Sequence, residues 1–172
     1  MQNAECISCR KPKANFECEV CEESVCKNCS QILDKETFSF MEEIPELLSR
    51  TLYCNPCFDH HVAPELDVYQ EIMERAKKVF VFFTTQRKEI PLIRRSKITV
   101  SVADRADRDD TIFRLGFMAA KENYNAITEV NVISQKIRHA GYQTSVWKGN
   151  GIPAQIDEEK MDRQDKLNQI YR

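Results

Sequence analysis

All eight cysteines of the 172-residue chain fall between residues 6 and 57. They form four pairs with two residues inside each pair, namely Cys6/Cys9, Cys18/Cys21, Cys26/Cys29 and Cys54/Cys57. A Cys-x-x-Cys pair can turn both of its sulfur atoms towards one ion, so four pairs can supply the ligands of two tetrahedral sites. Sets of four thiolates are typical of structural Zn²⁺ sites. The sequence therefore predicts two Zn²⁺ ions, each held by four cysteines.

Disulfide bonds are the alternative use of eight cysteines, but such frameworks are typical of small secreted domains. The sequence begins with Met1 and Gln2 and shows no apolar signal segment, so we expect a cytoplasmic protein with reduced thiols. The longest apolar run, residues 79–83, is too short to cross a membrane and predicts a strand.

Catalytic chemistry at these cysteines is not expected. A catalytic zinc ion keeps an open coordination position, whereas four complete pairs leave no protein ligand missing. His60 and His61 follow the last pair and could in principle replace a thiol, but we expect them in an exposed linker. The segment Gly149-Asn150-Gly151 is too short for a phosphate-binding loop. We therefore predict structural metal sites and no enzyme.

Charge is divided unevenly along the chain. Residues 1–62 hold six Lys and Arg residues against eleven Asp and Glu residues, a net charge of −5, and the remainder holds 19 against 16, a net charge of +3. Each Zn²⁺ bound by four thiolates adds a formal charge of −2, so a loaded N-terminal region is more acidic still. Acidic surfaces repel anionic membranes and nucleic acids. We expect a protein partner, no nucleic acid and no membrane lipid.

The cysteine distribution predicts a two-zinc finger over residues 1–62, a linking helix over 63–78, a small domain over 79–156 and a charged tail over 157–172. The finger is too short to be held by a hydrophobic core alone, so metal must supply much of its folding free energy. Between the third and fourth pairs, the helical spacing of Phe40, Ile44, Leu47 and Leu48 predicts a short helix, with Pro45 in its first turn.

The second half of the chain predicts an α+β domain with one main helix on an antiparallel sheet. We expect strands at residues 79–84, 98–102, 127–137, 142–148 and 152–156, with a helix over about 110–123. Tight turns are predicted at residues 139–141 and 149–151. In the tail, Met161, Leu167 and Ile170 predict a loosely held helix.

Two groups of side chains in this half could carry further chemistry. Residues 104–110 alternate carboxylates with arginines and could bind a hard cation, but a helix start follows them, so a capped surface loop is the better prediction. The carboxylates are Asp104, Asp107, Asp109 and Asp110. Tyr142 and Trp147 could form an exposed contact patch, although we expect them to pack on the sheet.

The cysteine spacing is Cys-x2-Cys-x8-Cys-x2-Cys-x4-Cys-x2-Cys-x24-Cys-x2-Cys, with CEVCEESVCKNCS at residues 18–30 and YCNPCF at 53–58. With these motifs, residues 6–57 resemble the FYVE-type zinc finger family and its FYVE-related relatives. The resemblance implies a treble-clef-like cross-brace. In that fold, one zinc ion is bound by Cys6, Cys9, Cys26 and Cys29, and the other by Cys18, Cys21, Cys54 and Cys57. B-box and RING fingers fit less well, because they use His ligands where this sequence has none.

The phosphoinositide-binding motif of FYVE domains is missing from this segment. A phosphate group needs Arg, Lys or His donors, yet residues 14–19 are ANFECE, and Leu52 and Tyr53 precede Cys54 where the family has Arg. No tryptophan precedes Cys6. The resemblance therefore implies a structural or protein-binding use of the scaffold.

A second resemblance concerns residues 78–156. The motifs TTQ at 84–86, EIP at 89–91, AAKENYNAI at 119–127 and VWKGNG at 146–151 are similar to those of a small bacterial family of α+β domains described as heavy-metal-binding. The resemblance implies the fold and self-association into a homo-oligomer. It does not extend to metal binding, because this region has no cysteine and a single histidine, His139.

We therefore expect a non-catalytic adaptor with two Zn²⁺ ions, whose finger binds another protein and whose residues 79–156 self-associate. The alternatives are a phosphoinositide-dependent membrane-targeting protein and a cross-brace finger that acts in ubiquitin transfer.

Overall fold

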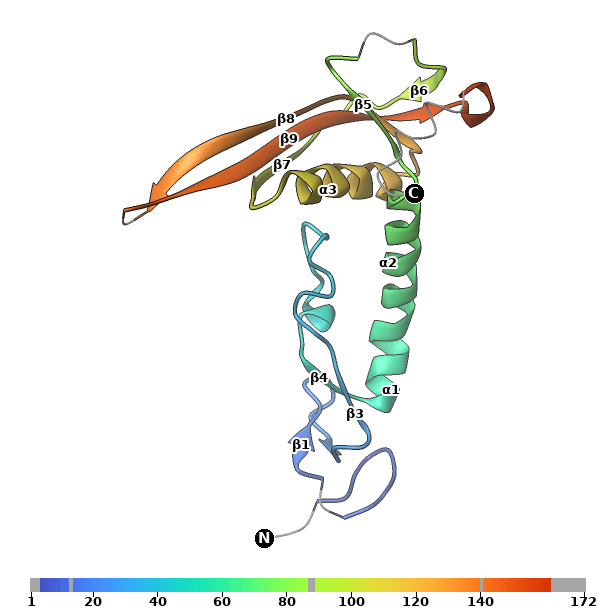
Figure 1. Ribbon diagram of the computed structural model, residues 1–172. Coiled ribbons are helices and arrows are strands. Elements are labelled where there is room, and N and C mark those ends of the chain that lie inside the picture. The colour runs from blue at the N-terminus through green and yellow to red at the C-terminus, as the bar shows by residue number, and fades with distance from the viewer. Residues whose placement is uncertain (1–3, 13, 87–88, 140, 162–172) are drawn as a thin grey trace. The chain divides into compact units, whose positions relative to one another are not determined.

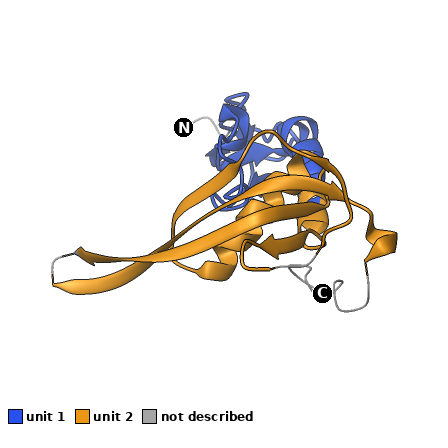
Figure 2. Ribbon diagram, turned by 90° about the horizontal axis from the view of Figure 1, so that it is seen from above, with its two compact units in different colours: residues 1–70 blue, residues 71–172 orange. Residues whose placement is uncertain are grey.

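The computed structural model describes residues 4–12, 14–86, 89–139 and 141–161. The chain divides into two compact units, Met1–Gln70 (unit 1) and Glu71–Arg172 (unit 2), which Figure 2 shows in different colours. The fold class is α+β, as predicted. No helix within the described ranges is long and apolar enough to cross a bilayer.

Unit 1 contains two short antiparallel strand pairs (Figure 1). The first joins β1 (Phe16–Glu17) to β2 (Ser24–Val25), and the second joins β3 (Ser30–Ile32) to β4 (Leu52–Cys54). A cluster of buried side chains lies between these pairs, and it consists of Cys6, Cys18, Val25 and Cys54. Three of its four members are cysteines, so thiol groups make up most of this cluster.

The helix predicted between the third and fourth cysteine pairs is only a three-residue 3₁₀ helix, η1 (Glu46–Leu48), with Pro45 as its N-cap. The longer helix predicted to include Phe40 and Ile44 was wrong. A residue before proline is held in an extended conformation, so Ile44 cannot continue a helix into Pro45. The Tyr53 hydroxyl lies 2.6 Å from the Leu47 carbonyl oxygen and 3.0 Å from that of Arg50, and ties this segment to β4.

A helical segment follows directly after β4. It passes from α1 (Asn55–Cys57) through the π-helical turn η2 (Phe58–Val62) into α2 (Ala63–Ala76). His60 and His61 therefore lie in a helical segment, where His60 is exposed, as expected, and His61 is half-buried. The boundary between the units falls inside α2. Within unit 1, the ring of Tyr69 on α2 contacts that of Phe38 edge to face, with their centroids 5.0 Å apart.

Unit 2 is a five-stranded sheet with one long helix against it. The strands are β5 (Phe80–Phe83), β6 (Leu92–Arg95), β7 (Val100–Arg105), β8 (Ala126–His139) and β9 (Tyr142–Ile156). Their order is β5-β8-β9-β6, and β7 also pairs with β9. Figure 1 shows the helix, α3 (Arg108–Lys121), lying along the sheet beside β7, β8 and β9.

The sheet is mixed, which corrects the prediction of a wholly antiparallel one. β5 runs parallel to β8, whereas β6, β7 and β8 are antiparallel to β9. A parallel pair needs a long crossover connection. The chain between β5 and β8 includes all of α3, so it is long enough to return β8 in the same direction as β5.

The loop before α3 is a helix cap. The Asp107 carboxylate accepts a hydrogen bond from the Asp110 backbone N–H at 2.9 Å, so α3 begins at Arg108, two residues before the predicted start. Asp110 pairs with Arg114 at 2.9 Å. These contacts engage the carboxylates of Asp107 and Asp110, as expected of a capped surface loop. The buried face of α3 consists of Thr111, Ile112, Phe113, Leu115, Gly116, Phe117, Ala119 and Ala120.

The turn predicted at residues 149–151 was wrong, because β9 runs through this segment without interruption. Its two glycines mark a close approach instead. A Cβ atom on Gly149 would lie 3.0 Å from the Thr111 Cγ2 of α3, and one on Gly151 would lie 2.8 Å from the Cδ1 of Ile127. Both glycines are thus explained by packing rather than by turning.

Replacing Gly151 with Ala is expected to destabilise unit 2 by about 1–3 kcal/mol, because the new methyl group overlaps the fully buried Ile127. Urea denaturation of the full-length protein, followed through the Trp147 fluorescence, measures this. Asn150→Ala is the matched control, since Asn150 lies between the two glycines and is exposed. Equal stability of the two variants would contradict the packing role of Gly151.

Two further expectations for unit 2 also change. Tyr142 is 82% exposed, so it does not pack on the sheet as predicted, whereas Trp147 is half-buried. Met161 is only 6% exposed and packs with Phe80 and Ile156, so the chain just after β9 is held against the core. The rest of the predicted tail helix, with Leu167 and Ile170, lies outside the described residues.

Candidate metal centres

The eight cysteine sulfurs gather into two groups of four. One group is Cys6, Cys9, Cys26 and Cys29, and the other is Cys18, Cys21, Cys54 and Cys57. Within each group the sulfur atoms all lie within 4.8 Å of one another. The first and third pairs therefore share one group, and the second and fourth pairs share the other. These are the two sets of four that the FYVE resemblance implies.

The sulfur separations fit a tetrahedral metal ion. A metal–sulfur distance of about 2.3 Å gives a tetrahedron with edges of about 3.8 Å. The Sγ atoms of Cys9 and Cys26 are 3.7 Å apart, and those of Cys21 and Cys54 are 3.8 Å apart. Both groups thus have the dimensions of a four-thiolate site.

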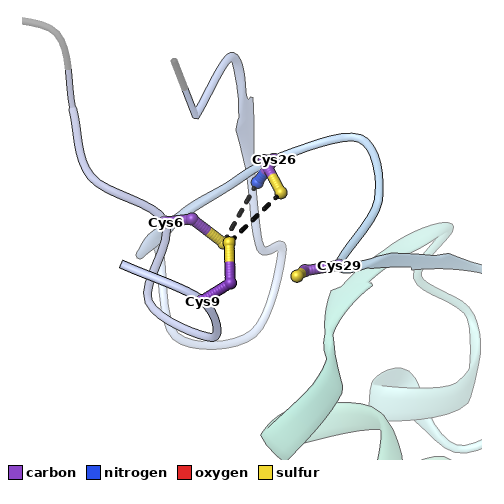
Figure 3. A group of neighbouring side chains, drawn as sticks. All are labelled: Cys6, Cys9, Cys26 and Cys29. Atoms are coloured by element: carbon purple, nitrogen blue, oxygen red, sulfur yellow. Dashed lines mark hydrogen bonds between the residues drawn. The ribbon is translucent and has the colours of Figure 1, made fainter. Parts of the chain in front are cut away.

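Backbone turns position the first group, which Figure 3 shows with its four side chains pointing towards a common centre. The turn after Cys6 closes through the Arg10 backbone N–H, which donates to the Cys6 carbonyl oxygen at 2.8 Å. The second turn closes through the Cys29 N–H, which donates to the carbonyl oxygen of Cys26 at 3.0 Å. The Cys26 N–H also donates to the Cys6 Sγ at 3.4 Å, which favours the thiolate form of Cys6.

The second group combines a similar turn with a helix start. The Glu22 N–H donates to the Cys18 carbonyl oxygen at 2.9 Å. Cys54 ends β4 and is the N-cap of α1, and Cys57 lies in α1 itself. Burial raises the pKa of Cys54 and of Cys57, and the backbone N–H of Cys57 lowers that of Cys54 only in part.

The turns at Cys6–Cys9 and Cys18–Cys21 each end in a residue in the left-handed backbone region. Arg10 has φ 59° and Glu22 has φ 61°, and each stands four residues after the first cysteine of its pair. Glycine usually marks such positions in a sequence, but here the residues are charged. The left-handed residues of these two turns could therefore not be predicted from the sequence, although the cysteines themselves could.

Proton binding within the groups shows why they need a cation. The Cys26 N–H lowers the pKa of Cys6 to about 6. For Cys18, burial raises the pKa, but backbone N–H groups including that of Cys21 outweigh it, and the pKa falls to about 7. The hydrogen bond with the Cys26 side chain and burial raise the pKa of Cys29 to about 12, and burial chiefly raises that of Cys57. Like charges this close disfavour ionisation of all four thiols, and a bound cation would offset that repulsion.

Metal affinity should therefore rise with pH. Cys6 and Cys18 are largely thiolates above pH 7, but Cys29 and Cys57 must release protons when metal binds. Each displaced proton changes the affinity about tenfold per pH unit. Competition for Zn²⁺ against a chromophoric chelator at pH 6 and at pH 8 should show much weaker binding at pH 6. Equal affinity at the two pH values would contradict thiolate ligation.

No known family model, curated protein or solved structure matches this chain. The two family resemblances therefore remain predictions that depend on the motifs quoted for them. What the structure adds independently is the sulfur geometry of the two groups.

Other polar clusters of the described residues do not form comparable sites. His60 and His61 contact each other edge to face, with ring centroids 4.8 Å apart, and belong to neither sulfur group. A cavity of about 250 Å³ in unit 2 is lined by residues that include Arg95, Thr128 and Glu129. The Arg95 guanidinium and the Glu129 carboxylate pair with each other at 2.7 Å, so their charges are already matched.

Proposed function

We propose that residues 1–62 form a structural cross-brace finger with two Zn²⁺ ions, and that the protein is a non-catalytic adaptor in which this finger binds another protein. The observation that supports the proposal best is the alternating grouping of the cysteines, in which the first and third pairs form one cluster and the second and fourth form the other. Such a grouping links distant parts of a short chain twice and fixes its fold without a large apolar core.

Zn²⁺ is the metal that suits these clusters. Soft thiolate ligands in a tetrahedral arrangement select zinc or iron–sulfur chemistry over hard cations. Zinc has no redox chemistry of its own and accepts four thiolates as a closed structural site. The N–H that Cys26 donates to the Cys6 sulfur stabilises the thiolate form that zinc requires.

A structural role follows from the ligand count. Each cluster supplies four protein ligands, so no coordination position is left for water or substrate. Seven of the eight cysteines, all but the exposed Cys21, also lie in or beside this buried cluster of unit 1. The metal ions would therefore act as the centre of the fold rather than as reagents.

Protein binding by the finger is supported by its surface. Two large apolar side chains on its strands are exposed, Phe16 at 41% and Ile32 at 72%. They stand in a region with a net charge of −5 before metal binding, which disfavours an anionic membrane or a nucleic acid. Exposed apolar side chains in an acidic surface are suited to a protein partner. We further propose that residues 79–156 self-associate, so that one assembly presents several fingers.

Metal analysis and affinity capture together test this proposal. The full-length protein should carry two zinc ions per chain and capture a defined protein from its native lysate. Ile32→Gln should keep both zinc ions and lose the partner, since Ile32 is exposed on β3. Binding to phosphoinositide-containing vesicles, or autoubiquitination activity, would favour the two alternative functions. A zinc content below two per chain would contradict the cross-brace.

A further inference from the structure

The hairpin formed by β8 and β9 extends beyond the rest of its sheet. Pairing of β5 with β8 ends at Val130, and pairing of β7 with β9 ends at Trp147. From Gln135 and Val146 to the end of the hairpin, β8 and β9 pair only with each other. Figure 1 shows this two-stranded ribbon projecting past α3. We call residues 133–139 and 142–148 the ribbon, whose base at Trp147 and Lys148 still lies beside β7.

The two faces of the ribbon differ in character. Directly opposed residues of an antiparallel pair point to the same face, and successive residues alternate between faces. One face carries Lys136 and Arg138 with their partners Ser145 and Gln143. Val132 and its partner Gly149 lie on this same face, nearer the base of the hairpin. A Cβ atom on Gly149 would contact Val132 and two side chains of α3, so this is the face that α3 covers.

The opposite face of the ribbon is mixed, with apolar side chains in the majority and no carboxylate. Its described side chains are those of Ile133, Gln135 and Ile137 from β8, and of Tyr142, Thr144, Val146 and Lys148 from β9. Ile133 is 47% exposed and Tyr142 is 82% exposed. A two-stranded ribbon is marginally stable in water by itself, so an exposed apolar face on this ribbon indicates a packing partner. We call this surface the open face.

The open face is complementary to itself under two-fold symmetry. An antiparallel, face-to-face arrangement centred near Ser145 would place Tyr142 at the tip of one ribbon opposite Lys148 at the base of the other. Thr144 would then meet Val146 of the partner copy. A lysine over a tyrosine ring is a favourable cation–π contact. The cations Lys136 and Arg138 lie on the other face, so no like charges are brought together there.

Two other arrangements are less favourable. Edge-to-edge pairing of two β8 strands would bring Lys136 and Arg138 of both copies close together. The second alternative is docking of the ribbon on the acidic finger. No Asp or Glu occurs between residues 130 and 156, so the cationic face with Lys136 would make that contact. The open face would then stay exposed to water.

We propose that the open face packs against the open face of a second copy of this chain, as a two-fold dimer with Tyr142 of each copy against Lys148 of the other. This deepens the proposed self-association of residues 79–156 and rests on it. A ribbon about 20 Å long and 10 Å wide buries only ~400 Å² per copy. Interfaces this small are weak, so the dissociation constant is expected on the order of 10–100 µM.

Sedimentation equilibrium of the zinc-loaded full-length protein across this concentration range tests the dimer. Tyr142→Lys places two lysines opposite each other and should raise the dissociation constant about tenfold or more. The exchange Tyr142→Lys with Lys148→Tyr restores the pair with the partners reversed and should recover dimerisation. Lys136→Gln with Arg138→Gln alters only the other face and should leave the dimer unchanged.

The outcomes separate the models. A protein that stays monomeric up to 500 µM, or an exchange variant that does not recover, overturns the dimer. Loss of association in the Lys136 and Arg138 variant, with Tyr142→Lys unaffected, would instead identify the acidic finger as the binding surface. Zinc content and partner capture are measured separately, so a monomer with two zinc ions and a bound partner would overturn this inference and leave the adaptor function intact.

Discussion

Removal of zinc from the full-length protein by a strong chelator is expected to unfold residues 1–62 and to leave the sheet of unit 2 folded. The buried cluster around Val25 otherwise consists of Cys6, Cys18 and Cys54, so without metal this part of unit 1 has few apolar contacts to hold it. A structural zinc ion contributes about 10 kcal/mol or more in small metal-binding domains. Unit 2 has its own core, which includes Phe80, Phe82 and Ile156.

Amide hydrogen exchange read residue by residue measures both halves of this prediction. Protection should disappear around Tyr53 and Val25, which are fully buried, and persist in α3 and β8. Addition of Zn²⁺ after removal of the chelator should restore the protection and serves as the control. Retained protection in residues 1–62 without metal would show that the clusters do not hold the fold.

Substitution of Cys18 with Ser is expected to reduce the zinc content from two ions per chain to at most one. Cys18 is fully buried, and its sulfur accepts backbone N–H groups that suit a thiolate. The first site should weaken as well, because the Cys18–Cys21 turn lies in the chain between Cys9 and Cys26. We expect its zinc affinity to fall at least about tenfold, since the loop that aligns its two halves is no longer fixed.

Metal analysis after dialysis and competition with a chelator of known affinity measure this effect. Lys27→Ala is the matched control, because Lys27 is exposed and stands between the ligands Cys26 and Cys29. The control should keep two zinc ions with unchanged affinity. A Cys18→Ser protein that binds two ions as tightly as the control would contradict the assignment of Cys18 as a ligand.

Local patterns predicted the linking helix and the main elements of unit 2, whereas β6 and the short strands of unit 1 were missed. The linking helix, β5, α3 and the two strands of the long hairpin all lie near their predicted positions, because amphipathic spacing and strand propensity act over neighbouring residues. The errors occurred where distant residues decide. Gly149 and Gly151 suggested a turn, but Thr111 and Ile127, far away in the sequence, are the side chains that require glycine there.

The direction of β5 could not be predicted for a similar reason. The strand pattern of Phe80–Phe83 is the same whether its neighbour is parallel or antiparallel. Only the return of the chain through α3 makes β5 parallel to β8. Tyr142 was likewise expected on the sheet, and its 82% exposure follows from the length by which β8 and β9 extend past the other strands.

The sequence by itself identified the candidate metal ligands of this protein. Eight cysteines in four close pairs can be recognised from spacing alone, because two residues between ligands is a local requirement of a metal-binding turn. Spacing alone could not fix which pairs share an ion, since any two pairs have the same local form. The tertiary structure decided that point by bringing Cys6 to Cys26 and Cys21 to Cys54, and it also divided the ribbon into a basic and an apolar face.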